Sequence, residues 1–478
     1  MDLNRRAALA GIAASLVPLH GARAADGPTI LTAAPLSTKL SPDLATAADL
    51  FAFDGKVAPP VLRIRHGEEL HVRLRNTLAK PASLHWHGVR GPAAQDGVGG
   101  ISQPPVAPGA DFTWRFTPPD PGTYLIRPLV LGGASELAGR GLSGMLVVEE
   151  KAPPAVDAEY ALLVRDWRLE SSGALAPFGR VEDSALAGRL GNRLSADGDM
   201  APKRVTLPAG SRVRLRLANG CNARVMRIRF DGLKAFVAAV DGQPTDTFEP
   251  LRSNLPFAPG SRYDIFFDLP RETGATSSIV ALIGQGLPIV EFTTGTERAA
   301  ERPDVVALPA NAALPPEIKL QNAARPELVI AGGAQKGPDG QPVYSGDPAR
   351  IWTINGQSGS ASAPPLFTAK RGQPVVMGVT NRTGLVQTFH LHGHVFRLLH
   401  PLDDGWEPYW LDTMQVPEGK TLRLAFMADN PGRWTLGSTV LERFDTGLWG
   451  TYQVPRPDPI KRGDCRQCGF RVASVFWR

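Results

Sequence analysis

Large apolar residues recur at every second position in many short stretches of the chain. The clearest stretches are 70–74, 112–116, 213–217 and 422–426. Successive side chains of a strand point to opposite faces, so this pattern predicts β-strands with one buried and one solvated face. Helical periodicity is weak throughout, and the chain is predicted to be all-β.

The chain also contains a longer repeat. The run 67–76 (GEELHVRLRN) is echoed at 210–219 (GSRVRLRLAN) and at 372–381 (GQPVVMGVTN). Each copy is followed by a glycine turn and another alternating strand, at Gly109, Gly260 and Gly419. Copies roughly 150 residues apart have the spacing of whole domains rather than solenoid units. The repeat therefore predicts three β-sandwich domains of Greek-key type.

Proline-rich segments mark the expected boundaries. One is KAPP at 151–154, and a Pro/Ala-rich stretch runs from about 297 to 326. The predicted division is a signal peptide 1–24, domains 25–150 and 151–296, a linker 297–345, a domain 346–455 and a basic tail 456–478.

The N-terminus has the pattern of an export signal. Arg5 and Arg6 precede an apolar stretch, and Ala22-Arg23-Ala24 offers a cleavage site. The paired arginines predict export by the twin-arginine route to the periplasm, and an ordinary secretory signal is the alternative. No apolar run has the length of a transmembrane helix, so the chain is not expected to span a membrane.

The formal charge of +6 gathers at the two ends of the chain. The signal contributes a net +2 and the tail from Pro455 a net +4, so the body between is near neutral. A nucleic-acid binder usually has a basic face, so no nucleic-acid partner is expected. The tail could contact an acidic partner or a membrane surface, or be solvated. The protein is expected to be a monomer, with a protein partner left open.

Three cysteines are present: Cys221, Cys465 and Cys468. In an oxidising compartment the CxxC of the tail is expected to form a disulfide. Two thiols are too few for a metal site, and Gly469 stands where c-type haem attachment needs histidine. Cys221 is expected to be a small buried hydrophobe.

Histidines are few, yet they cluster in His85-Trp86-His87 and His390-Leu391-His392. Residues two apart on a strand share a face, so each motif presents two imidazoles together. Imidazole suits copper and zinc. Two such motifs at matching places in sibling domains therefore predict a metal site.

At this point the sequence resembles the multicopper oxidases, especially the bacterial three-domain type that includes copper-efflux oxidases and laccases. The matching stretches are LHWHGVR (84–90), DGVGGISQPPVAPG (96–109), PGTY (121–124), RLRLANGCNAR (214–224), FHLHGHVF (389–396) and LERFDTGLWG (441–450). The resemblance implies three cupredoxin-like β-sandwiches. It also implies a type 1 blue copper that takes electrons from substrate, and a trinuclear cluster, between the first and third domains, that reduces oxygen.

The family's copper-binding motifs are only partly present. By resemblance, His85 and His390 are type 2 ligands, and His87 and His392 are type 3 ligands. The other type 3 positions hold Arg127, Leu129, Gly437 and Thr439. The type 1 positions hold Gln387, Ser438, Arg443 and Leu448.

These replacements predict that the electron entry site is absent. Blue copper needs a cysteine thiolate with two histidines, and Ser438 offers only a hydroxyl. Arg127 brings a permanent cation to the type 3 position. Asp96 and Glu442 resemble family acids that move protons, but without the full cluster they are expected to be plain polar residues. His394 lies outside the coordinating positions.

Two interpretations of the four remaining histidines stay open. His85, His87, His390 and His392 either bind one copper or zinc ion, or are neutral core residues that bridge two domains by hydrogen bonds. The matching functions are a non-catalytic periplasmic scaffold or binding protein, as in the copper-free SufI (FtsP) branch of the family, and a mononuclear copper protein or residual copper-dependent oxidoreductase. Seven methionines without a Met-rich segment weaken a copper-efflux interpretation.

Overall fold

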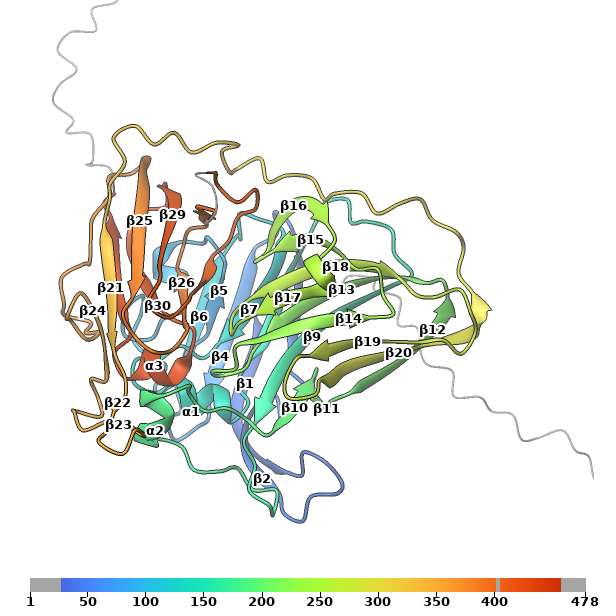
Figure 1. The fold of residues 1–478 in the computed structure, drawn as a ribbon, viewed down its shortest axis with the longest axis horizontal. Helices are drawn as coiled ribbons and strands as arrows, with labels where there is room; N and C mark the ends of the chain where they lie inside the picture. The colour runs from blue at the N-terminus through green and yellow to red at the C-terminus, as the bar shows by residue number, and fades with distance from the viewer. Residues whose placement is uncertain (1–26, 401–404, 457–478) are drawn as a thin grey trace, which may run out of the picture.

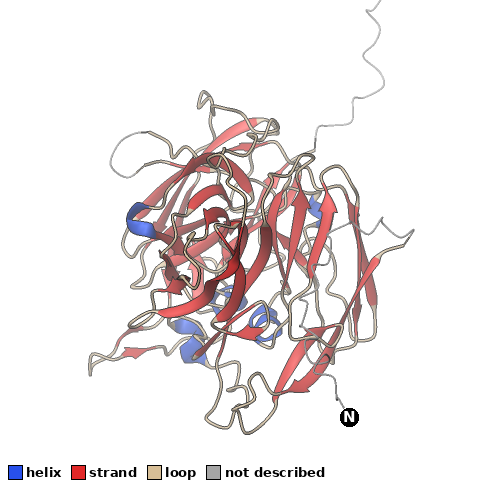
Figure 2. Cartoon of the chain, turned by 90° about the vertical axis from the view of Figure 1, so that its right-hand side faces the viewer, coloured by secondary structure: helices blue, strands red, loops and turns tan. Residues whose placement is uncertain are grey.

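The computed structural model describes residues 27–400 and 405–456 (Figure 1). The predicted signal peptide and the CxxC of the tail (Cys465 and Cys468) lie outside this part. Strands dominate the described chain, and its helices are short (Figure 2). None of these helices is long and apolar enough to cross a membrane.

The first unit consists of two four-stranded sheets packed face to face over one apolar core. The sheet β2-β1-β4-β6 comprises β1 (Thr29–Thr38), β2 (Ala48–Phe53), β4 (Leu70–Asn76) and β6 (Asp111–Phe116). The sheet β3-β8-β7-β5 comprises β3 (Val61–Arg65), β5 (His85–His87), β7 (Gly122–Arg127) and β8 (Gly144–Glu149). The short helices are η1 (Ala93–Gln95) and α1 (Ala134–Gly139).

The second unit has the same plan with more strands. Its larger sheet, β11-β10-β9-β13-β18-β15-β16, comprises β9 (Ala158–Trp167), β10 (Arg193–Ala196), β11 (Asp199–Met200), β13 (Arg212–Asn219), β15 (Phe236–Val240), β16 (Gln243–Phe248) and β18 (Arg262–Asp268). The other, β12-β20-β19-β14-β17, comprises β12 (Lys203–Ala209), β14 (Met226–Asp231), β17 (Asn254–Phe257), β19 (Thr276–Ala281) and β20 (Leu287–Arg298). The helices are α2 (Val181–Ala185) and η2 (Leu251–Ser253).

The third unit repeats the plan once more. The sheet β24-β21-β25-β29-β27 comprises β21 (Glu327–Gly332), β24 (Trp352–Ile354), β25 (Gln373–Asn381), β27 (Arg397–Leu398) and β29 (Thr421–Ala428). The sheet β28-β26-β30-β31 comprises β26 (Gln387–Leu391), β28 (Thr413–Val416), β30 (Gly432–Ser438) and β31 (Trp449–Val454). Helix α3 (Leu441–Asp445) and a hairpin of β22 (Gln335–Lys336) and β23 (Pro342–Val343) complete it. The predicted all-β, cupredoxin-like architecture is confirmed.

The segment predicted as a linker, 297–345, is only partly irregular. Its chain leaves β20 at Arg298 and runs along the outside of the molecule to the third unit (Figure 1). Strand β21 then pairs in parallel with β25, so the end of this segment belongs to a sheet.

The repeated run forms an equivalent strand in each unit, β4, β13 and β25. Each pairs in parallel with the first strand of its unit and antiparallel with the strand after the glycine turn. The closing asparagines, Asn76, Asn219 and Asn381, are fully buried. Each side-chain amide donates to two or more backbone carbonyls, and its oxygen accepts the N–H two residues later. The repeat therefore encodes a loop that needs this side chain.

The polar face of β13 departs from the predicted pattern. A solvated face was expected, yet the side chains of Arg214 and Arg216 are almost fully buried. Both donate to Asp264 of the neighbouring strand and to Glu150, which follows β8 of the first unit. Buried charged residues are usually paired, and these pairs cross to the first unit, so alternation along β13 marks an interface between two units rather than a solvated surface.

Candidate metal centre

The four predicted histidines lie together between the first and third units. His85 and His87 are on β5, His390 is on β26, and His392 follows it. The rings stack in two pairs across the junction, with centroid distances of 4.3 Å for His85–His392 and 3.7 Å for His87–His390. All four are 1–2 % exposed. The structure thus brings together every residue of the predicted site.

Hydrogen bonds determine the tautomer of two rings. His85 Nδ1 lies 2.7 Å from the Asp96 carbonyl oxygen, and His390 Nδ1 lies 3.0 Å from that of Asp412. A carbonyl only accepts, so each Nδ1 carries the proton and each Nε2 keeps its lone pair. Both Nε2 atoms are buried, and neither has a hydrogen-bond partner among the residues that the structure describes. Buried polar atoms are rarely left in that state, and a metal ion would satisfy both.

Asp96 orients two of the imidazoles. Its carbonyl accepts from His85, and its carboxylate oxygen Oδ2 lies 2.9 Å from His392 Nδ1. Burial alone would raise the pKa of Asp96, but the two histidines beside it hold that pKa below its usual range. Burial lowers the pKa of His392 to about 3. Asp96 therefore does more than the plain polar residue that the sequence predicted, because it orients two of the imidazoles.

Asp412, which the sequence patterns did not single out, has the matching role in the third unit. Its carbonyl accepts from His390, and its carboxylate lies 3.3 Å from His390 Nδ1 and 3.9 Å from His87 Nε2. The Arg262 guanidinium donates to both carboxylate oxygens, at 2.9 and 2.6 Å. Two groups of donor atoms within 4.8 Å result, His85/His390/His392 and His87/His390/Asp412. No motif could mark Asp412, because Arg262 and His87 reach it from the other two units.

His87 differs from His85 and His390 in its hydrogen bonds. Burial comes first among the causes that hold its pKa well below the usual range, followed by His390 and Arg262. Its Nε2 lies 3.2 Å from the Thr413 hydroxyl. His87 therefore has a protein partner where His85 and His390 have none.

Arg127 points into the junction of the three units. Both terminal nitrogens donate to the Thr439 carbonyl at 3.1 Å, and one reaches that of Cys221 at 3.4 Å. Leu129 packs in an apolar cluster with Phe444. At Gly437 a Cβ would lie 2.8 Å from Trp449 Cβ, so a larger side chain there requires movement.

The residues that the resemblance assigns to the type 1 positions are buried. Arg443 Nη1 donates to Gln387 Oε1 at 2.8 Å. Ser438 Oγ accepts the Val440 N–H at 3.1 Å. Cys221, the cysteine within the described residues, is buried as predicted, in the core of the second unit. Among the described residues, the donor set around Ser438 therefore contains no thiolate.

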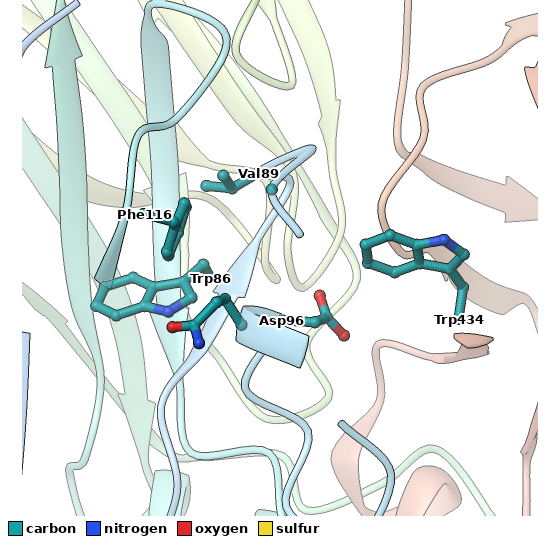
Figure 3. A pocket seen from close by; sticks show the side chains of 7 residues that line it. Trp86, Val89, Asp96, Phe116 and Trp434 are labelled. Atoms are coloured by element: carbon teal, nitrogen blue, oxygen red, sulfur yellow. The ribbon is translucent and has the colours of Figure 1, made fainter. Parts of the chain in front are cut away.

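A small hollow lies beside Asp96, and no histidine lines it. Figure 3 shows it between Trp86 of the first unit and Trp434 of the third, with the Asp96 carboxylate between them. It leaves essentially no room even for a water molecule, and the remaining lining residues are Val89, Gly91, Gln95 and Phe116. Substrate pockets of roughly 300 Å³ or more are usual, so this hollow is too small for a phenolic substrate.

His394 makes stability depend on pH. Its Nε2 accepts the Asn430 N–H at 3.2 Å, its Nδ1 contacts the Tyr452 hydroxyl at 2.6 Å, and burial lowers its pKa to about 3. A neutral ring stabilises the fold above pH 6.5, and this contribution is lost as pH falls from 6.5 toward 3. His394→Gln should therefore cost about 2 kcal/mol less at pH 5 than at pH 7.5. Urea unfolding at the two pH values measures this, and a constant difference would contradict it.

Comparison with known proteins gives the class of this fold and site. Three sequence models described as multicopper oxidase match residues 25–153, 164–302 and 335–458. The chain is 27% identical to multicopper oxidase MmcO of Mycobacterium tuberculosis, over 89% of this chain and 87% of that protein. Multicopper oxidase structures from Pseudomonas thermotolerans and Pseudomonas parafulva are 29% and 31% identical, with TM-scores of 0.78 and 0.77. They cover 90% and 89% of this chain, and all of their own chains are covered. The chain belongs to the multicopper oxidase family.

Proposed function

We propose that this chain is an exported, non-oxidase member of the family that holds one copper or zinc ion between its first and third units. The ligands would be the Nε2 atoms of His85 and His390, joined by His392. The observation that carries the proposal is the pair of buried Nε2 atoms without a partner, each on a ring whose Nδ1 is held by a carbonyl.

The family's four-copper complement does not suit the residues present. A type 1 copper needs a thiolate, and that position holds Ser438 beside the Arg443 cation. Of the six type 3 positions, four hold Arg127, Leu129, Gly437 and Thr439. A second cation beside the buried Arg127 guanidinium is electrostatically unfavourable. Laccase-type oxidation is therefore not proposed.

The residues suit a binding or scaffold role better than turnover. A bound copper ion would supply Lewis-acid or one-electron chemistry. Around it, Asp96 and Asp412 hold the imidazoles in orientation, and burial excludes water. The hollow beside Asp96 is too small for an organic substrate. We therefore favour a periplasmic binding or scaffold protein, exported through its paired arginines and monomeric, over a residual copper-dependent oxidoreductase.

A metal-free scaffold is the second candidate. Burial lowers the pKa of His87, His390 and His392, which keeps these rings neutral inside the junction. Neutral stacked imidazoles could join the two units without an ion.

Metal content decides between these candidates. The mature protein is loaded with copper, and separately with zinc, freed of loose ions, and analysed by mass spectrometry. We expect about one ion per chain, and none after the double change His85→Ala and His390→Ala. His394→Gln, outside the ligand set, should retain the ion. A protein without stoichiometric metal would be the scaffold, and nearly four coppers would overturn the interpretation of Ser438.

A further inference from the structure

Two buried arginines stand at positions where the family has copper ligands. Arg127, at a type 3 position, is 3 % exposed, and Arg443, at a type 1 position, is 2 % exposed. The ion pairs within the described residues include neither of them, although a buried guanidinium is normally paired with a carboxylate. Their hydrogen bonds go instead to carbonyl and amide oxygens.

Each arginine contacts a residue from another ligand position of the same copper centre. Arg127 donates to the carbonyl of Thr439, which is also at a type 3 position. Arg443 donates to the side chain of Gln387, which is also at a type 1 position. The guanidinium groups therefore join pairs of residues that a copper centre would have joined.

The same groups tie the second unit to the junction. Arg127 belongs to the first unit, and its second carbonyl partner is Cys221 of the second unit, at 3.4 Å. Arg443 belongs to the third unit and donates to the Leu186 carbonyl of the second unit at 3.2 and 3.1 Å. Five N–H donors in a planar fork allow one arginine to span several chain segments, as a metal ion does.

We propose that the guanidinium groups of Arg127 and Arg443 replace copper as the positive centres that hold the three units together. The contacts between the units at Arg127 and at Arg443 then need no metal. Only the site beside His85 and His390 is left to bind an exchangeable ion.

Glu442 is the acid that most affects both arginines, and burial raises its own pKa. It is the first acid that raises the pKa of both arginines, against the burial that lowers each pKa to about 10. Both groups thus stay protonated at neutral pH. Glu442 Oε1 accepts from Asn222 at 2.8 Å, and its buried Oε2 has no hydrogen-bond partner.

Replacing the guanidinium by a metal site tests the proposal at the first place. His87 lies near Thr439, since a Cβ at Gly260 would lie 2.7 Å from His87 Nε2 and 3.5 Å from Thr439 Cγ2. The double variant Arg127→His/Thr439→His would place three imidazoles there. In metal-free buffer we expect a lower melting temperature than that of the parent. Copper should restore it, with one additional ion per chain.

Arg165→His is the matched control. Arg165 is also buried, also has a pKa lowered to about 10, and also donates to carbonyls between two units, those of Gly141 and Val57. It is not at a copper-ligand position, so copper should not recover its lost stability. The proposal is wrong if copper restores the double variant no better than this control, or if no additional ion binds.

A second variant tests the proposal at Arg443. Its result does not depend on whether the Arg127→His/Thr439→His variant folds. Gln387→His/Ser438→Cys/Arg443→His restores a thiolate and two imidazoles, and should bind copper with an intense blue colour that the parent lacks. Absence of that colour in a folded, copper-loaded variant would overturn the proposal at this site. Both variants are also made on the His85→Ala/His390→Ala background, so the outcome is independent of the proposed single ion.

Discussion

Replacing Asp412 by alanine is expected to lower the free energy of unfolding by about 3–5 kcal/mol, because the change leaves a buried cation unpaired. Arg262 is fully buried, and both of its terminal nitrogens bind the Asp412 carboxylate, at 2.9 and 2.6 Å. The Thr413 hydroxyl donates to the same carboxylate at 2.8 Å. Without Asp412, the Arg262 guanidinium and the Thr413 hydroxyl lose their acceptor at the junction of the second and third units.

Asp241 affects how much of the unfolding free energy is lost in Asp412→Ala. Burial, followed by the nearby Asp412, raises the pKa of Asp241, so its carboxyl holds a proton more readily than an ordinary aspartic acid does. Its oxygen Oδ1 lies 3.7 Å from Arg262 Nη1. Without Asp412 the Asp241 carboxyl ionises more readily and supplies part of the missing charge. The loss should therefore be nearer 3 than 5 kcal/mol, and larger in Asp412→Ala/Asp241→Asn.

Urea unfolding of the mature protein measures this effect. The control is Asp429→Ala, because Asp429 is half-exposed and lies 3.7 Å from Arg90, a geometry worth about 1 kcal/mol or less. Equal losses for the two variants would show that the buried network does not stabilise the fold.

Gly97→Ala is expected to destabilise the protein by more than about 3 kcal/mol and to abolish metal binding. Gly97 has a φ of +88°, which L-residues rarely adopt. A Cβ there would overlap the Leu84 carbonyl oxygen and lie 2.8 Å from His85 Cα. Gly97 directly follows Asp96, which orients His85 and His392. The clash therefore moves the backbone on both sides of the proposed ligands.

Gly109→Ala is the control that has the backbone strain of Gly97→Ala without its steric clash. Gly109 has a similar φ of +75°, but nothing lies within 4 Å of a Cβ at this position. Its substitution should cost only the backbone strain, about 1–2 kcal/mol, and leave the metal content unchanged. Melting temperature and metal content of both variants test the argument. A Gly97→Ala protein as stable as Gly109→Ala would contradict it.

The sequence was sufficient for the architecture because its signals are local. Period-two alternation depends on one strand and its own core, and the repeat ending in Asn76, Asn219 and Asn381 encodes the same loop three times. Two HxH motifs on strands placed four imidazoles on the inner faces, and the structure brings these four together.

Only the tertiary structure decided what surrounds these histidines. Asp412 joins the site because Arg262 of the second unit and His390 of the third meet it there, and its sequence neighbours carry no sign of this. The polar face of β13 is buried because Glu150 of another unit covers it. Whether Arg127 entered the junction depended equally on Thr439, which lies 312 residues away in the chain.

One physical cause separates what the sequence predicted from what only the tertiary structure decided. Burial of apolar side chains is non-directional and follows from each strand's own periodicity, so the sequence by itself determined the three sandwiches and the positions of His85, His87, His390 and His392. Hydrogen bonds and ion pairs need partners at defined distances and angles. Here those partners come from different units, so only the packing of the three units decided which charges are neutralised and which nitrogens remain available to a metal ion.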